Sequence, residues 1–266
     1  FLREGNAFED FMRPDRVVVG CDTEKAQEII SKIYKPLYLI ETPILFTDLK
    51  TAELIKYAGN AFLAVKISYI NQMADLCEKV GADVHDVSRG IGLDKRIGSK
   101  FLHPGPGYGG SCFPKDTKAL VKTANYYGSN ISIVENVINY NTQRKLDMAE
   151  KIISTIGKSY KNKKVSILGL AFKPETDDMR ESPCLDIIPK LQEKNLQISA
   201  FDPVAMDEAK KLLQNIQFAE SIEDCVNNSD AIVILTEWNE FRSLSPGRLN
   251  KYMKGNIIFD LRNALN

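Results

Sequence analysis

One stretch of the 266-residue chain combines residue types that can do covalent chemistry. From His103 to Leu120 the sequence is HPGPGYGGSCFPKDTKAL, so glycines and prolines lead directly into Cys112 and a predicted helix. Glycines leave the backbone bare, which lets a ligand approach the main chain closely. Pro114 is typical of a first helical turn, and Gly128 marks the predicted helix end. We therefore expect Cys112 at, or just before, a helix N-terminus.

That position favours the thiolate form of Cys112. The helix dipole and the free N–H groups of the first turn stabilise negative charge, and the thiolate is the nucleophilic form of cysteine. Lys115 adds to this effect if it turns towards the sulfur. Asp116, four residues after Cys112, faces the same side and can handle a proton or a water molecule. The alternative is a glycine-rich surface turn followed by a buried, inert cysteine.

A second pair of candidates lies on a long predicted helix that follows Asp48 and ends near Val80, before Gly81. Its apolar residues cover several faces, which indicates burial on several sides, as in a spine between domains or across a dimer. Lys56 and Asn60 interrupt this apolar surface four residues apart, hence on one face. We favour a pair that faces a ligand, and an ordinary exposed lysine is the alternative.

From Lys164 onwards predicted strands (164–170, 197–201, 231–235 and 256–259) alternate with predicted helices. This alternation specifies a parallel sheet with helices on both faces, and ligands bind beyond the carboxyl ends of such strands. The charged residues just past those ends are Lys173, Arg180, Asp202, Glu237 and Arg262. Three cations at one edge would suit a diphosphate, which arginine can bind through two hydrogen bonds. Unrelated surface charges are the alternative.

Residues 1–47 predict a strand, a helix at 23–34 and a second strand. This unit buries too little apolar surface alone, so we interpret it as the tail of a larger α/β domain. The first residue is not Met, and residues 1–47 contain no Gly-x-Gly-x-x-Gly turn, so we expect upstream sequence. The predicted domains are thus this remnant, a helical central domain at 48–157 and a Rossmann-like C-terminal α/β domain at 158–266.

Composition excludes several classes of function. Lys plus Arg and Asp plus Glu both total 35, so no net field favours nucleic acid or an anionic membrane. The five cysteines are scattered without a Cys-x-x-Cys pair, and there are only two histidines, so we expect no metal site and a reducing cytoplasm. No apolar run approaches the length of about 20 residues that spans a bilayer, and no signal peptide is recognised.

Four segments together resemble the UDP-glucose/GDP-mannose dehydrogenase family, most closely its UDP-glucose branch. They are FLREG at 1–5, AELIKYAGNAF at 52–62, GYGGSCFPKD at 107–116 and GLAFKPETDDMRESP at 169–183. The match covers the whole chain in order. The resemblance implies an NAD-dependent, two-step oxidation of the sugar C6 alcohol to a carboxylate, with UDP-N-acetylmannosamine or GDP-mannose as alternative substrates of the wider family.

The resemblance also implies residue roles. Cys112 would hold the aldehyde as a thiohemiacetal and then as a thioester, and Asp116 would assist hydrolysis. Lys56 and Asn60 would stabilise charge on the C6 oxygen and position water. Implied contacts of the nucleotide sugar are Phe1, Leu2, Glu4, Phe101, Leu102, His103, Pro104, Gly105, Gly109, Lys173, Arg262 and, from the neighbouring subunit, Arg96. Implied contacts of NAD are Glu4, Lys115 and Arg180.

The implied partner is a second copy of the chain, in a homodimer formed through the helix at 48–80. Because the glycine fingerprint is missing, we expect these residues alone to bind NAD hardly at all. Two other functions stay open. One is a dimerising module that only binds a nucleotide sugar, and the other is a cysteine-dependent acyl or glycosyl transferase.

Overall fold

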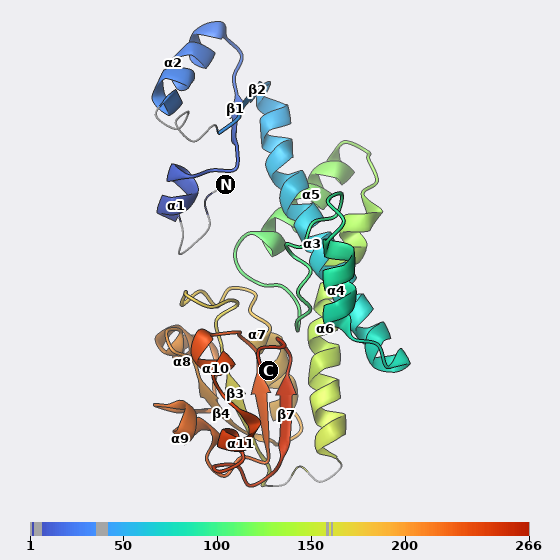
Figure 1. The fold of residues 1–266 in the computed structure, drawn as a ribbon, viewed down its shortest axis with the longest axis vertical. Coiled ribbons are helices and arrows are strands. Elements are labelled where there is room, and N and C mark those ends of the chain that lie inside the picture. The colour runs from blue at the N-terminus through green and yellow to red at the C-terminus, as the bar shows by residue number, and fades with distance from the viewer. Residues whose placement is uncertain (1, 3–6, 36–41, 158–159, 161, 266) are drawn as a thin grey trace. The chain divides into compact units, whose positions relative to one another are not determined.

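The computed structural model describes residues 2, 7–35, 42–157, 160 and 162–265. The chain forms two compact units, Phe1–Phe62 and Leu63–Asn266, and the boundary falls inside one long helix. In the first unit, α1 (Ala7–Met12) precedes β1 (Val17–Gly20), α2 (Glu24–Tyr34) and β2 (Ile44–Thr47), as Figure 1 shows. The two strands pair in parallel, which confirms the predicted strand, helix and strand.

The long helix α3 spans Leu49–Val80. Asp48 caps it, because its carboxylate accepts the Thr51 N–H at 2.9 Å and the Thr51 hydroxyl at 2.6 Å. One stripe of α3 is exposed in this single chain, so the expected burial on several sides, which included burial across a dimer, stays a prediction. The large apolar residues of that stripe are Phe62, Tyr69, Leu76 and Val80, and we call these four residues the α3 stripe.

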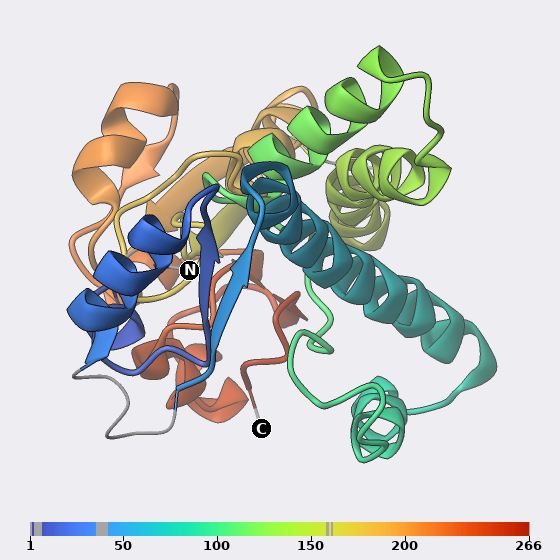
Figure 2. The ribbon, with the colours of Figure 1, turned by 90° about the horizontal axis from the view of Figure 1, so that it is seen from above.

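Three further helices precede the sheet of the second unit: α4 (Val84–Gly92), α5 (Phe113–Tyr126) and α6 (Ser132–Ile156). Asp83 caps α4 because its carboxylate accepts the His85 N–H at 2.7 Å. Helix α5 packs against α6, which can be followed in the view from above in Figure 2. The middle of the chain is therefore helical, as expected.

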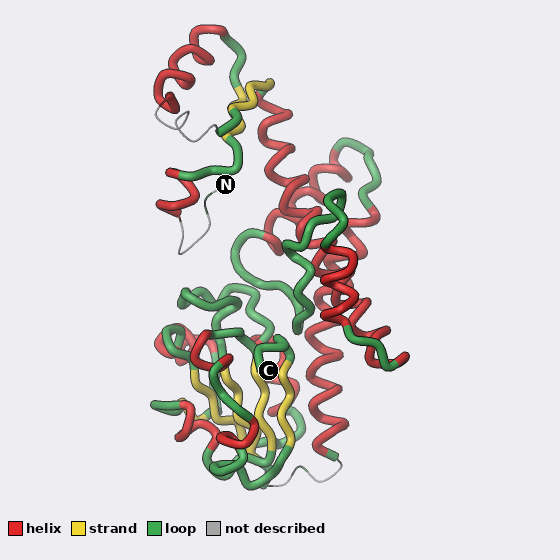
Figure 3. Tube along the Cα trace, viewed as in Figure 1, coloured by secondary structure: helices red, strands yellow, loops and turns green. Residues whose placement is uncertain are grey.

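The C-terminal part holds a parallel five-stranded sheet in the order β5-β4-β3-β6-β7 (Figure 3). Its strands are β3 (Lys164–Leu168), β4 (Gln197–Phe201), β5 (Gln217–Phe218), β6 (Ala231–Ile234) and β7 (Ile257–Asp260). The helices between them are α7 (Cys184–Gln192), α8 (Met206–Leu212), α9 (Ile222–Val226), α10 (Asn239–Arg242) and α11 (Pro246–Leu249).

The sheet is buried on both faces, which explains the continuous apolar runs of its strands. Val165 and Ile167 of β3 pack with residues of α6, α7 and α8, whereas Leu168 packs with residues of α9, α10 and α11. The α/β class with a Rossmann-like C-terminal sheet is thereby confirmed. Among the described helices, none combines the length and the apolar content that crossing a bilayer requires.

Candidate active site

Cys112 lies where the sequence predicts it, as the N-cap residue of α5, with Pro114 in the first turn. Its thiol is exposed, so the alternative of a buried and inert cysteine is wrong. Asp116 follows one helical turn later and donates its N–H to the Cys112 carbonyl at 2.8 Å. The Asp116 side chain is buried, and its carboxylate lies 3.6 Å from the exposed ammonium of Lys115.

The other cysteines differ from Cys112 in exposure. Burial raises the pKa of the Cys184 thiol to about 12 and that of the Cys225 thiol to about 11. Cys77 is also buried, and Cys21 is half-buried. A buried thiol with a raised pKa remains protonated near pH 7 and is a poor nucleophile. Cys112 is therefore the most accessible thiol in the chain.

The segment 105–111, which we call the glycine loop, is held by side chains of α3 and α6. Asn71 accepts the Gly105 N–H at 2.7 Å, and Arg144 donates to the Gly105 carbonyl at 3.1 Å. Asn141 accepts the Tyr108 N–H at 2.8 Å and donates to the Tyr108 carbonyl at 3.0 Å. These bonds satisfy backbone groups that the glycine loop buries without regular secondary structure.

The far end of the glycine loop lies against residues 180–181. The Gly110 N–H donates to the Arg180 carbonyl at 2.7 Å. A Cβ atom at Gly109 would lie 2.4 Å from the Glu181 carbonyl oxygen, so this approach requires glycine. Gly110 has a φ of +81°, and a Cβ there would meet the Phe172 ring. Gly109 and Gly110 thus let two stretches of backbone pack together, and the expected approach of a ligand to the glycines stays a prediction.

The predicted cations at the carboxyl edge of the sheet lie around Phe172. Arg262 donates to the Phe172 carbonyl at 3.0 Å, and Lys173 lies 5.5 Å from the Phe172 ring centre. Arg180 binds Asp178 at 2.8 Å, and the Asp178 carbonyl accepts the Phe172 N–H. Arg262 also pairs with Glu237 at 3.3 Å. Lys173 and Arg262 thus lie beside Phe172, and the convergence of all three cations on one ligand stays a prediction.

The buried Asp202 at the end of β4 holds the loops of this edge. Its carboxylate accepts hydrogen bonds from five donors: the N–H groups of Leu170, Ala171, Val204 and Ala205 and the indole N–H of Trp238. A buried carboxylate is tolerated when hydrogen bonds replace its lost hydration. Asp202 is therefore part of the scaffold of the edge rather than a charge open to a ligand.

The remaining predicted residues fall into several groups. Leu102, Pro104, Gly105 and Gly109 are buried in or beside the glycine loop, whereas His103 is exposed and Phe101 is half-buried. Arg96 is exposed and pairs with Asp94, and Leu2 is exposed. Phe1 and Glu4 lie outside the described residues. Lys56 is half-buried and Asn60 buried on α3 in the first unit, so their expected convergence on Cys112 stays a prediction.

The polar residues that hold the glycine loop are missing from the sequence prediction. Asn141, Arg144 and Lys145 of α6 are each at most 7% exposed, although they lie among the apolar positions of that helix. These three residues interrupt the apolar stripe of α6, and such interruptions are the sequence signal from which buried polar residues could have been predicted.

Comparisons with known proteins follow the same division of the chain. Residues 50–143 match the central domain of the UDP-glucose/GDP-mannose dehydrogenase family, and residues 166–266 match its UDP binding domain. Residues 1–38 match its NAD binding domain.

The chain is also similar to named relatives. A UDP-glucose 6-dehydrogenase of Rhizobium meliloti is 53% identical over 99% of this chain and 61% of the relative, and one of Rickettsia bellii is 48% identical over 100% and 62%. The chain thus spans about three fifths of their length.

The solved UDP-glucose dehydrogenase of Pyrobaculum islandicum has a TM-score of 0.86 at 33% identity, over 98% of this chain and 62% of that one. The UDP-D-ManNAc dehydrogenase of Pyrococcus horikoshii has a TM-score of 0.83 at 26% identity, over 100% and 60%.

The close approach of Gly109 to Glu181 generates a stability prediction. Gly109→Ala should lower the free energy of unfolding, measured in urea, by about 1–3 kcal/mol, because the added methyl group overlaps a backbone oxygen. The matched control is Gly90→Ala in α4, where a Cβ meets nothing within 4 Å. That control should leave stability unchanged or raise it by up to about 1 kcal/mol. Equal effects of both substitutions would contradict the steric account.

Proposed function

Because the chain belongs to the UDP-glucose/GDP-mannose dehydrogenase family, we propose that the protein containing it oxidises the C6 alcohol of UDP-glucose to a carboxylate with NAD. The observation that carries this proposal is the exposed Cys112 at the N-cap of α5, directly after the glycine loop. The 53% identity to a named UDP-glucose 6-dehydrogenase supports the choice of sugar.

In the proposed mechanism Cys112 retains the intermediate between two oxidations. Two hydrides leave C6, one at each oxidation, and NAD held near Lys115 and Arg180 would accept them. After the first step the Cys112 sulfur adds to the aldehyde carbon and gives a thiohemiacetal. After the second step the same sulfur carries a thioester, which water hydrolyses to the carboxylate and the free thiol. The Cys112 thiol lies at the N-terminus of α5 and is exposed, so an incoming carbonyl carbon can approach it.

Other residues are proposed to handle charge and water. Lys56 would stabilise the developing negative charge on the C6 oxygen, and Asn60, on the same helix face, would position the attacking water. Asp116 is buried one turn after Cys112, where its carboxylate can take a proton from that water.

The UDP-sugar and NAD are both anionic, and we propose that they bind half-buried and exposed cations of the second unit. Lys173 and Arg262 lie at the carboxyl edge of the sheet, and Arg262 is adjacent to Gly105, where a Cβ would lie 3.1 Å from its guanidinium. They suit the diphosphate of a UDP-sugar. The side chains of Lys115 and Arg180 are 76% and 60% exposed, so they can reach a negatively charged cofactor such as NAD.

We also propose that the three predicted segments act as separate parts. Residues 1–47 would complete an NAD-binding domain, 48–157 would form the helical dimerisation domain and 158–266 would bind UDP. The five free cysteines favour a reducing compartment, so we propose the cytoplasm.

Replacing the proposed nucleophile tests the mechanism. In the complete protein Cys112→Ser should lower kcat for NADH formation at least about a thousandfold, because a hydroxyl is a much weaker nucleophile at neutral pH. UDP-glucose binding, measured by calorimetry, should change little. Cys21→Ser, at a half-buried thiol of the first unit, is the control and should retain activity. Full turnover by Cys112→Ser would remove Cys112 from the mechanism.

Substrate choice is tested with a panel of nucleotide sugars. UDP-glucose should give the highest kcat/KM among UDP-glucose, UDP-N-acetylmannosamine and GDP-mannose, measured through NADH formation. A mismatched sugar loses contacts worth about 1–3 kcal/mol each, so a preference of tenfold or more is expected. A preference for UDP-N-acetylmannosamine would instead favour the specificity named for the Pyrococcus horikoshii relative.

The α3 stripe supports a proposed homodimer. Its four large apolar residues recur on one face of the helix and are exposed in this chain. Contiguous exposed apolar surface of this kind marks protein interaction sites. A second copy of the chain, packed on this stripe, would bury it and place Arg96 near the partner subunit.

If the α3 stripe forms the dimer interface, a charged side chain introduced there should weaken the dimer. Leu76→Glu should weaken the dimer at least about tenfold, because a carboxylate would then lie in an apolar interface. Sedimentation velocity over a range of concentrations measures this change. Leu212→Glu, at an exposed leucine of α8, is the matched control and should leave the oligomeric state unchanged. An unaltered dimer in Leu76→Glu would place the interface elsewhere.

A further inference from the structure

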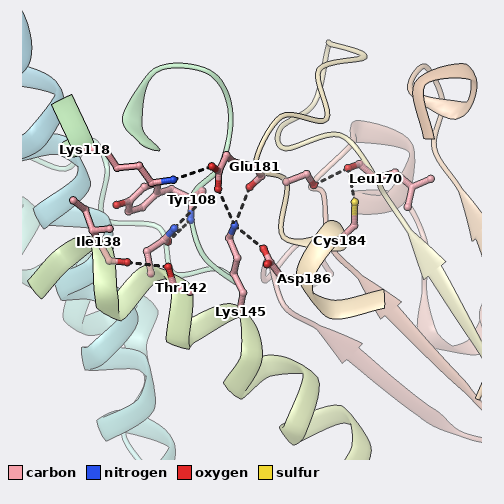
Figure 4. Close-up of polar contacts among 11 residues, drawn as sticks. Tyr108, Lys118, Ile138, Thr142, Lys145, Leu170, Glu181, Cys184 and Asp186 are labelled. Atoms are coloured by element: carbon pink, nitrogen blue, oxygen red, sulfur yellow. Dashed lines mark hydrogen bonds and ion pairs between the residues drawn. The ribbon is translucent and has the colours of Figure 1, made fainter. Parts of the chain in front are cut away.

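The ammonium group of Lys145 is buried between α6 and the segment that enters α7, as Figure 4 shows. Its side chain is 4% exposed, and its Nζ lies 2.8 Å from the Asp186 carboxylate and 3.9 Å from the Glu181 carboxylate. Nζ also donates to the backbone carbonyl of Glu181 at 3.1 Å. A buried ammonium needs oxygen partners, and this site supplies two within hydrogen-bond distance, with the Glu181 carboxylate as a third, more distant charge.

The residue that Lys145 holds has an unusual backbone. Glu181 has a φ of +53°, in the left-handed region that is uncommon for residues other than glycine. Such a conformation persists when neighbouring contacts impose it. The Glu181 carboxylate also accepts a hydrogen bond at 3.0 Å from Lys118, which lies on α5, the helix that begins after Cys112. Two lysines from two helices therefore fix this one strained residue.

The backbone of Glu181 packs directly against the glycine loop. Its carbonyl oxygen lies 2.4 Å from the position that a Cβ atom at residue 109 would take. The preceding carbonyl, of Arg180, accepts the Gly110 N–H. One turn before Lys145 on α6, Asn141 binds the Tyr108 backbone in both directions. Helix α6 thus fixes the glycine loop directly through Asn141. Through Lys145 it also fixes residues 180–181, against which the glycine loop packs.

We propose that Lys145 is a positioning residue, which sets the place of Cys112 relative to Arg180 by holding residues 180–181 against the glycine loop. It does not touch the reacting atoms. This inference rests on the proposed function in one respect, that Cys112 is the nucleophile and Arg180 contacts the cofactor. Without the ammonium, the Asp186 and Glu181 carboxylates lose their shared buried cation, and the Glu181 carbonyl loses its donor.

The test replaces Lys145 with Met in the complete protein. The matched control is Lys151→Met, on the same helix, because Lys151 pairs with Glu78 and touches neither the glycine loop nor residues 180–181. Three quantities are measured: kcat for NADH formation, KM for UDP-glucose and the rate at which iodoacetamide alkylates Cys112, followed by mass spectrometry. Cys21 in the same protein gives an internal reference rate.

Lys145→Met should lower kcat about 10–100-fold, because a displacement of about 1 Å at a reacting group has an effect of this size. KM for UDP-glucose should change less than kcat. The alkylation rate of Cys112 should shift at least about threefold as its helix N-terminus and neighbours move, with the Cys21 rate constant. Lys151→Met should match the wild type in all three. Lys145→Arg, which keeps the charge, should recover part of the lost kcat.

Wild-type kcat and wild-type Cys112 alkylation in folded Lys145→Met would overturn the proposal, and a lowered melting temperature alone would also count against it. If Lys145→Met does not fold, Lys145→Gln, which keeps one hydrogen-bond donor, is judged by the same criteria. The alkylation rate needs no cofactor or sugar. A wild-type protein without dehydrogenase activity would therefore refute the proposed function. The alkylation rates of Cys112 in wild type and Lys145→Met would still decide the role of Lys145.

Discussion

The candidate site depends on the contact between two stretches of main chain, the glycine loop and residues 180–181. That contact exists because Gly109 has no side chain and because the Gly110 N–H meets the Arg180 carbonyl at 2.7 Å. Backbone packed this closely leaves no room for adjustment by rotamer changes. The exposed thiol at the start of α5 and the cations around Phe172 therefore belong to one continuous piece of structure.

The contact between the glycine loop and residues 180–181 is held by buried polar side chains of α6. Arg144 forms an ion pair with Asp75 and donates to the Gly105 carbonyl, and Lys145 lies between Asp186 and Glu181. Taking a cation out of water is unfavourable unless charge and hydrogen bonds compensate. Here the compensating partners are the carbonyls and carboxylates of the site itself. Charge burial therefore serves to fix one loop geometry more than to add stability.

Sequence patterns predicted the features that depend on interactions between residues close together in the chain. The Asp48 cap, the position of Cys112 at a helix start and the buried strand β3 all follow from a few neighbouring residues. The two-residue strand β5 and the short helices α9, α10 and α11 are too brief to show a period, so they were not predicted. Lys145 escaped prediction because its partner Glu181 lies 36 residues away in the sequence, and only the folded chain brings them together.

Helix α6 runs without interruption from the glycine loop into the sheet. Val137 packs with Tyr108 near the loop, and the turns from Met148 to Ile156 belong to the core beneath the strands. One uninterrupted helix therefore joins the residues that hold the glycine loop to the core of the sheet. Under the proposed function, movement that admits a substrate is expected outside α6, because a bend within α6 would separate the glycine loop from the core of the sheet.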